Sequence, residues 1–276
     1  MESDSSISTA PILAEGSTAT IYEWKDETVL KLFKQRSSWH TNEIASTKVA
    51  HDLGLPVPRV CSGLLEIGQQ EGIMFERVDG PTMADFLEDH PTEVEHCAII
   101  AADLQSRMHS MEIANLPLLT DLLSWSIHQT NPLETKTIKL VEDILAQLPA
   151  REFLCHCDFY PRNLLMSPQG PMIIDWAIGT RGNPTADLAR TWLISRLLLD
   201  TEKEPDGKDM HWQRFWDTFF RRYEKLNPSC FDQFLQWQIV VATASLVWDK
   251  SLTSMDSRLS FINTALSDSE HPWLRA

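Results

Sequence analysis

The sequence predicts an α+β protein with two lobes, a smaller one rich in strands and a larger one that is mainly helical. Short apolar runs of strand length, separated by polar turns, fill most of the first 79 residues. From Gly80 onward, apolar residues instead recur at helical spacing. We therefore expect an N-terminal lobe over residues 1–79, a C-terminal lobe over residues 80–276, and a cleft between them.

The first lobe begins as an antiparallel meander, because Gly16-Ser17-Thr18 and Lys25-Asp26-Glu27 separate its first apolar runs. A helix follows, which Gly54 and Pro56 end. Two further strands complete the lobe, and Glu76–Pro81 is the expected connector. The expected elements are strands Ile12–Glu15, Ala19–Trp24 and Thr28–Phe33, helix Ser37–Leu53, and strands Arg59–Leu65 and Ile73–Val78.

The second lobe combines helices with a cluster of short strands. Its apolar residues keep helical spacing in three segments before residue 150, and the chain after Pro184 is helical in pattern throughout. The expected elements are helices Thr82–Glu88, Val94–Met108 and Glu134–Leu148, and strands Phe153–His156, Leu164–Met166 and Met172–Ile174.

Charge and composition exclude several classes of function. A net charge of −15 argues against a nucleic-acid or anionic-membrane partner, because phosphate groups attract Lys and Arg surfaces. No apolar run reaches the length of a membrane span, and the N-terminus lacks the pattern of a leader, so we expect a cytoplasmic protein. Five cysteines, an odd number in a long chain, indicate free thiols and no zinc site.

One segment carries residues suited to phosphoryl transfer. It reads His156-Cys157-Asp158-Phe159-Tyr160-Pro161-Arg162-Asn163, and Asp175-Trp176 follows an apolar strand. Phosphoryl transfer needs a group that accepts the proton of the attacking hydroxyl, and oxygen ligands that hold Mg²⁺ on a triphosphate. Asp158, Asn163 and Asp175 could surround one phosphate in this way. A single aspartate more often caps a turn or a helix, and the joint spacing is what favours the catalytic interpretation.

This segment resembles the aminoglycoside phosphotransferase and choline kinase group, relatives of the protein kinases that use an H-G-D-x-x-x-x-N loop and an I-D-W strand end. Residues Gly179–Ala189 are similar to the group's G-x-P-x-x-D-L-A segment. The resemblance implies a two-lobed protein-kinase-like fold, with Asp158 as the catalytic base and Asn163 and Asp175 as Mg²⁺ ligands. It also implies that His156 supports the loop and that Asp187 buttresses it from the following helix.

Residues of the first lobe complete the expected nucleotide site. Lys31 lies in the middle of a strand, where an inward ammonium needs a partner such as a nucleotide phosphate; a solvent-facing lysine is the alternative. Glu43 resembles the kinase glutamate that pairs with this lysine. Gly16, Ser17 and Thr18 match the group's reduced nucleotide loop, although a glycine between strands is more often a hairpin turn.

The resemblance also places the adenine. It implies that the main chain of Glu76 and Val78 contacts the base, and that Met74 guards the back of the nucleotide pocket. Two positions depart from related patterns. Cys157 replaces the group's Gly, which would strain the loop if the position requires a positive φ. Trp176 replaces the Phe of the protein-kinase D-F-G, and the segment from there to Pro184 is too short for a phosphorylatable activation loop.

We therefore expect a small-molecule kinase that uses ATP and Mg²⁺, with GTP as an alternative nucleotide. Its acceptor is a small hydroxylated molecule that is like an aminoglycoside, choline or a sugar. A catalytically impaired pseudokinase or scaffold is the alternative function, and the oligomeric state stays open. Arg181 and Arg190 are expected to form ordinary ion pairs rather than to bind substrate.

Overall fold

The chain divides into two compact units, each built from two separate stretches of sequence. The first unit consists of Met1–Phe86 and Pro161–Gly179, and the second of Leu87–Tyr160 and Thr180–Ala276. The structure is a computed structural model that describes residues 10–130, 133–201, 209–248 and 255–267. The part of the chain that it describes contains no helix long and apolar enough to cross a membrane.

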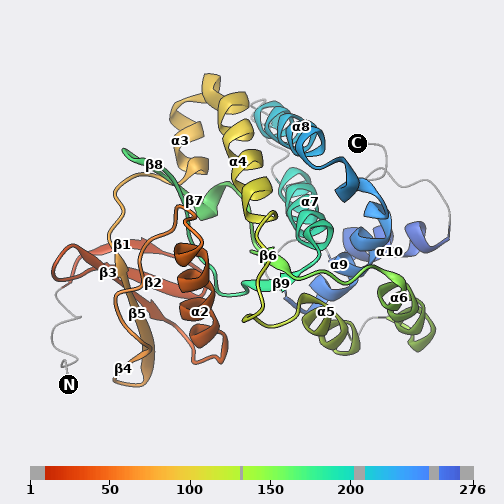
Figure 1. Cartoon of the computed structure of the whole chain (residues 1–276), viewed down its shortest axis with the longest axis horizontal. Coiled ribbons are helices and arrows are strands. Elements are labelled where there is room, and N and C mark those ends of the chain that lie inside the picture. Colours follow the sequence, from red (N-terminus) through yellow and green to blue (C-terminus); the bar gives the residue numbers. More distant parts are fainter. Residues whose placement is uncertain (1–9, 131–132, 202–208, 249–254, 268–276) are drawn as a thin grey trace. The chain divides into compact units, whose positions relative to one another are not determined.

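The described residues of the first unit form a five-stranded antiparallel sheet in the order β1-β2-β3-β5-β4, with helix α2 beside it (Figure 1). A hairpin and the start of α3 complete the unit. Its elements are β1 (Ile12–Glu15), β2 (Ala19–Glu23), β3 (Thr28–Phe33), α2 (Trp39–Asp52), β4 (Leu65–Ile67), β5 (Gln70–Glu76), α3 (Met83–Asp89), β7 (Leu164–Ser167) and β8 (Gly170–Ile173).

One face of the sheet carries a buried apolar cluster of the first unit. Ala19, Phe33, Ile73 and Phe75 form its buried centre. Residues that alternate along a strand share a face, so Lys31 points to the same side as Phe33. In the strand register, Lys31 lies between Ile21 on β2 and Ile73 on β5. The lysine thus lies in an apolar row.

The β7–β8 hairpin packs against the rest of the first unit. This unit therefore extends past residue 79 and includes residues 161–179. The amide of Met166 donates to the carbonyl of Pro81 at 2.8 Å, and the amide of Ile173 donates to the carbonyl of Pro56 at 2.8 Å. These main-chain bonds tie residues 161–179 to a segment that precedes them by about a hundred positions. Residues 80–86 join the same unit.

In the described residues of the second unit, the elements are helices and one short strand pair, β6 with β9. Every residue of α7 from Pro184 to Ser195 is buried, and α9 is buried from Trp237 to Leu246, so these two helices form the centre of the unit. Its elements are α4 (Val94–Met108), α5 (Leu119–His128), α6 (Thr135–Gln147), β6 (Phe153–Cys155), β9 (Thr180–Gly182), α7 (Pro184–Thr201), α8 (Asp209–Leu226), α9 (Phe234–Trp248) and α10 (Met255–Leu266).

Most expected elements are present, and one expected strand is wrong. Residues 59–65 do not form a strand; Val60 makes an isolated bridge to Phe75, and the edge strand β4 begins only at Leu65. The hydroxyl of Ser62 accepts a hydrogen bond from the amide of Met74, so a side chain takes the place of a main-chain acceptor beside β5. Helix α5 and strand β9 were not predicted, and β5 begins three residues before the predicted strand.

Gly80 gives a direct test of the packing between the connector and β7. Its φ is +146°, and a Cβ at this position would lie 2.2 Å from the carbonyl oxygen of Met166. We expect Gly80→Ala to lower the free energy of unfolding by about 2–3 kcal/mol, because backbone strain of this kind costs of order 1–3 kcal/mol before the clash is added. Urea unfolding measures the change.

Gly63→Ala is the matched control, because nothing lies within 4 Å of a Cβ there. This variant should change the free energy of unfolding by less than about 1 kcal/mol. Equal effects of the two substitutions would contradict the close approach of residue 80 to β7.

Candidate active site

The loop after β6 is fixed by a buried carboxylate on α7. Asp187 is 0% exposed, and its two oxygens accept the amides of consecutive residues, His156 to Oδ2 at 2.8 Å and Cys157 to Oδ1 at 2.7 Å. Burial raises the pKa of Asp187, but hydrogen bonds from His109 and from the loop amides outweigh it and hold the pKa below its usual value. Asp187 therefore acts as a charged acceptor beneath the loop.

Cys157 has a left-handed backbone, with φ of 63°. Only glycine adopts this conformation freely, so the cysteine carries strain that the surrounding contacts must hold. Its side chain is buried, and Sγ lies 3.2 Å from Oγ1 of Thr180. Burial raises the pKa of its thiol well above the usual value, so the sulfur is an unreactive packing group.

His156 lies under the loop and bonds to its backbone. Its side chain is fully buried, and Nδ1 accepts the amide of Asp158 at 3.2 Å. The ring meets Phe159 edge to face, with centroids 6.0 Å apart. These contacts agree with a supporting role for His156.

A second histidine, His109 at the C-terminal cap of α4, continues the network beneath Asp187. Its Nε2 lies 2.9 Å from Oδ2 of Asp187, and its Nδ1 lies 2.6 Å from the hydroxyl of Tyr223. His109, Cys155 and Asp187 place one ligand atom each within 4.8 Å of one another, the spacing of a metal site. Both ring nitrogens and both carboxylate oxygens already have hydrogen-bond partners, so the cluster is a structural network.

Asp158 follows the strained residue and lies beside an arginine. Its side chain is 28% exposed, and Oδ1 lies 3.5 Å from Nη2 of Arg190 on α7. The sequence analysis expected an ordinary ion pair at Arg190, and an ion pair is present. Its partner, however, is the candidate base.

The β7–β8 hairpin brings the two candidate metal ligands to one end of the first unit. Leu164 pairs with Ile173, and the amide of Ile174 donates to the carbonyl of Asn163 at 3.0 Å. Asn163 therefore precedes one strand of the hairpin where Asp175 follows the other. An amide oxygen and a carboxylate are oxygen donors of the kind that Mg²⁺ prefers.

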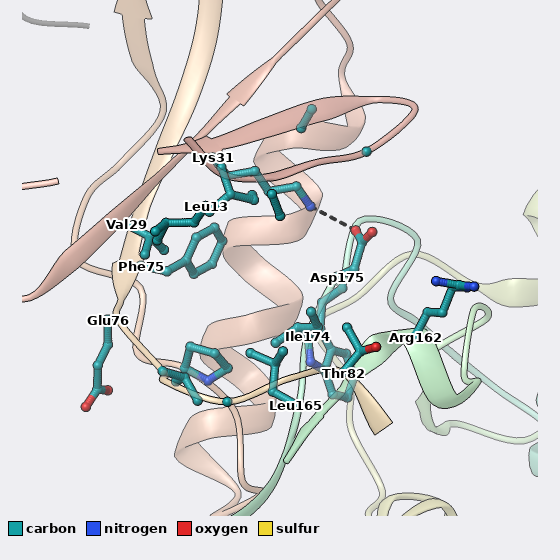
Figure 2. A pocket seen from close by; sticks show the side chains of 18 of the residues that line it. Leu13, Val29, Lys31, Phe75, Glu76, Thr82, Arg162, Leu165, Ile174 and Asp175 are labelled. Atoms are coloured by element: carbon teal, nitrogen blue, oxygen red, sulfur yellow. Dashed lines mark hydrogen bonds and ion pairs between the residues drawn. The ribbon is translucent and has the colours of Figure 1, made fainter. Parts of the chain in front are cut away.

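Lys31 joins the sheet to this hairpin through two carboxylates. Its Nζ donates to Oε1 of Glu43 at 2.7 Å. It also donates to Oδ1 of Asp175 at 2.9 Å (Figure 2). Lys31 is 8% exposed and Glu43 is 1% exposed, whereas the side chain of Asp175 is 37% exposed. The lysine therefore points inward, and the alternative of a solvent-facing lysine is wrong.

The charges of this cluster are coupled. Burial lowers the pKa of Lys31, but the charges of Asp175 and Glu43 outweigh burial and raise it above its ordinary value. Burial raises the pKa of Glu43 to about 7, against the opposing effect of Lys31. Lys31 is thus a permanent buried cation, while Glu43 keeps one oxygen, Oε2, without a hydrogen-bond partner among the described residues.

Helix α2 also holds the segment that follows Asp175. The side-chain amide of Asn42 donates to the carbonyls of Ala177 and Gly179 at 2.9 and 3.0 Å. The hydroxyl of Ser46 donates to the carbonyl of Trp176 at 2.7 Å. One face of α2 therefore carries Glu43, the partner of Lys31, and also holds the segment that follows Asp175. Neither Asn42 nor Ser46 was predicted from the sequence to have this role.

A cavity of about 630 Å³ in the first unit opens beside Lys31 and Asp175. Its walls are largely apolar, and Figure 2 shows Leu13, Val29, Phe75, Leu165 and Ile174 around it. An apolar slot with a cation and a carboxylate at one end suits a planar base joined to an anionic group.

Several expected nucleotide contacts line this cavity. Gly16 and Thr18 do, as do Glu76 and Val78, whereas Ser17 and Met74 do not. In the strand register Met74 lies opposite Leu30, so it faces the other side of the sheet from Lys31, and Phe75 lines the cavity instead. Alternation along β5 leaves two possible faces, and only the register with β3 places Phe75 on the face of Lys31.

Comparison with known proteins decides the family. A family model described as "Phosphotransferase enzyme family" matches residues 10–221, more than half of the chain. The chain belongs to this family. It is therefore a phosphotransferase of the type that includes aminoglycoside phosphotransferases and choline kinases, as its loop and strand-end motifs predicted.

Solved structures of low sequence identity share the fold of this chain. Aminoglycoside phosphotransferase APH(4)-Ia, in a ternary complex with ADP and hygromycin B, matches with a TM-score of 0.63 and 14% identity over 94% of this chain and 91% of that chain. A choline/ethanolamine kinase family protein from Mesorhizobium loti gives a TM-score of 0.62 and 14% identity over 96% and 90%. The predicted kinase-like fold, with an antiparallel sheet and a larger helical region, is confirmed.

A curated relative matches at the level of sequence. Acyl-CoA dehydrogenase family member 11 of Rattus norvegicus is 27% identical over an alignment of 176 residues, and the match covers 55% of this chain. The match spans only 22% of the length of that relative. It is a likeness to one part of a much longer protein.

The left-handed backbone at Cys157 can be tested in this phosphotransferase by substitution. We expect Cys157→Val to lower the free energy of unfolding by about 2 kcal/mol or more, because a branched residue is strained at positive φ. Cys157→Gly should stay within about 1 kcal/mol of wild type, since relief of strain offsets the lost burial of Sγ. Urea unfolding of both variants measures the difference. Equal stabilities would show that residue 157 is not left-handed.

Proposed function

We propose that this phosphotransferase moves the γ-phosphoryl group of ATP to a hydroxyl of a small molecule. The observation that carries the proposal is the buried Lys31 cation, held by Glu43 and Asp175 at one end of an apolar-walled cavity. A permanent cation at that point suits the phosphate groups of a nucleotide whose base occupies the apolar part. The main chain at Glu76 and Val78 would contact the base, and Gly16-Ser17-Thr18 would cover the phosphates.

In the proposed reaction Asp158 is the general base. It accepts the proton of the acceptor hydroxyl as the hydroxyl oxygen bonds to the γ-phosphorus. The bond from that phosphorus to the bridging oxygen breaks, and ADP leaves with the electron pair. Lys31 balances the negative charge of the phosphates, and His156 and Asp187 hold the backbone of the loop.

Asn163 and Asp175 would hold Mg²⁺, since both present oxygen donors at the same end of the hairpin and the Asp175 side chain is partly exposed. When bound, the ion would neutralise charge on the transferred phosphate. The proposed location of the reaction is the cytoplasm, because ATP is available there. All five cysteines, each within the described residues, are free thiols, as a reducing compartment requires.

The acceptor class is proposed from chemistry and from the names of the relatives. The net charge of −15 favours a cationic or neutral acceptor. Aminoglycosides, choline, ethanolamine and sugars meet this description, and the names of the structural relatives include the first three. The test is ADP release with each acceptor in turn, with ATP and with GTP. Turnover with none of them, together with ATP binding, would favour a pseudokinase.

Asp158→Asn tests the base. We expect kcat to fall about 10²- to 10⁴-fold, because a positioned general base contributes a factor of that size, while the affinity for ATP stays unchanged. ADP release gives kcat, and the thermal shift with Mg²⁺ and ATP gives binding. A variant that turns over at the wild-type rate would remove Asp158 from the mechanism.

Asp175→Asn tests the metal site. The measured quantity is the Mg²⁺ concentration that produces half of the thermal shift caused by ATP. In the variant this concentration should rise at least about tenfold, because the ion loses a charged ligand. Asp79→Asn is the control, since Asp79 is an exposed acid that pairs with Arg77 outside the cavity lining. An unchanged Mg²⁺ dependence in Asp175→Asn would contradict the assignment.

A further inference from the structure

Arg190 binds the loop at two consecutive residues. Its Nε donates to the carbonyl of Cys157 at 3.2 Å, and its Nη2 lies 3.5 Å from Oδ1 of Asp158. The arginine is 4% exposed. Its buried guanidinium therefore contacts both the strained peptide and the side chain of the candidate base.

Arg190 and Asp187 together fix both polar groups of residue 157. They stand three positions apart on α7, so they face the same side of the helix. Asp187 accepts the amide of Cys157, and Arg190 donates to its carbonyl. A left-handed residue that is not glycine needs such constraints from outside, and two side chains of one helix supply them.

The guanidinium is itself held in place from the other side. Its Cζ lies 5.6 Å from the ring centroid of Trp248, so the face of this indole ring, which belongs to α9, supports the guanidinium. The indole Nε1 of Trp248 donates to Oγ of Ser126 at 2.6 Å, and that hydroxyl donates to the carbonyl of Leu122 in α5. A chain of contacts thus runs from α5 through α9 and α7 to Asp158.

We infer that Arg190 is a positioning residue of the phosphotransfer reaction, which sets the direction of the Asp158 carboxylate through the ion pair and through the peptide of Cys157. This inference rests on the proposed role of Asp158. It assigns to Arg190 no contact with substrate, because the side chain is enclosed by the loop and Trp248. A carboxylate that lost this support would lose its alignment with the acceptor hydroxyl while the cavity of the first unit kept its lining residues.

The test compares Arg190→Met with a matched arginine. Arg181 also pairs with a carboxylate, Glu152 at 2.7 Å, and donates to a carbonyl, that of Leu116 at 2.8 Å, but it contacts neither Asp158 nor Cys157 in those bonds. We expect Arg190→Met to lower kcat about 100-fold with KM for ATP unchanged, as a misplaced catalytic group does. Arg181→Met should keep kcat, and Arg190→Lys, which retains the charge without the planar fork, should lie between Met and wild type.

Two outcomes would overturn the inference. One is an Arg190→Met variant with wild-type kcat. The other is a fall in kcat that the Arg181→Met variant shows to the same extent, or that matches the loss of folded protein in thermal unfolding.

A second measurement does not depend on turnover, so it separates failure of this inference from failure of the proposed function. The loss of melting temperature caused by Arg190→Met is measured in wild type and in Cys157→Gly. If Arg190 holds the strained peptide, the loss should be smaller in the glycine background, where the left-handed backbone needs less support. Equal losses in the two backgrounds would overturn the inference, even in a protein that shows no turnover with any acceptor.

Discussion

The carboxylate of Asp187 is the constraint on which the loop of the second unit depends. Two consecutive amides converge on it, and they hold Cys157 in a conformation that its own side chain disfavours. Burial without partners would be costly for this charge, so His109 and the loop amides are required around it. The position of Asp158 is thus a result of the packing of α7 rather than of the local sequence of the loop.

The first unit depends in the same way on a buried charge, here a cation. Lys31 lies in an apolar row of the sheet, which is tolerable because Glu43 and Asp175 both pair with it. The pairing joins β3 and α2, which are neighbours in sequence, to the residue Asp175 that lies 144 positions after Lys31. Asn42 and Ser46 strengthen the same junction from α2. The contacts that balance the charge of Lys31 therefore also determine how these elements pack together.

The sequence was most informative where chemistry limits the choice of residue. Lys31 and Glu43 were predicted as a pair, and the structure brings them together with Asp175 because a strand lysine in an apolar row must find anions. Phe75 was missed, because its role depends on the register between β3 and β5. Arg190 was dismissed as an ordinary arginine, because its partner comes from a loop that lies more than thirty positions earlier and only tertiary packing unites them.

The way the chain enters the first unit has a consequence for synthesis on the ribosome. That unit is closed by residues 161–179, and the Lys31–Asp175 contact spans 144 positions. The sheet made first must therefore wait for the β7–β8 hairpin, with Lys31 and Glu43 lacking the third member of their cluster while residues 87–160 are added. Long-range closure of this kind slows folding, and it leaves an incomplete, aggregation-prone surface on the nascent chain. Chaperone dependence during translation is the expected cost of building the Lys31 cluster from a discontinuous unit.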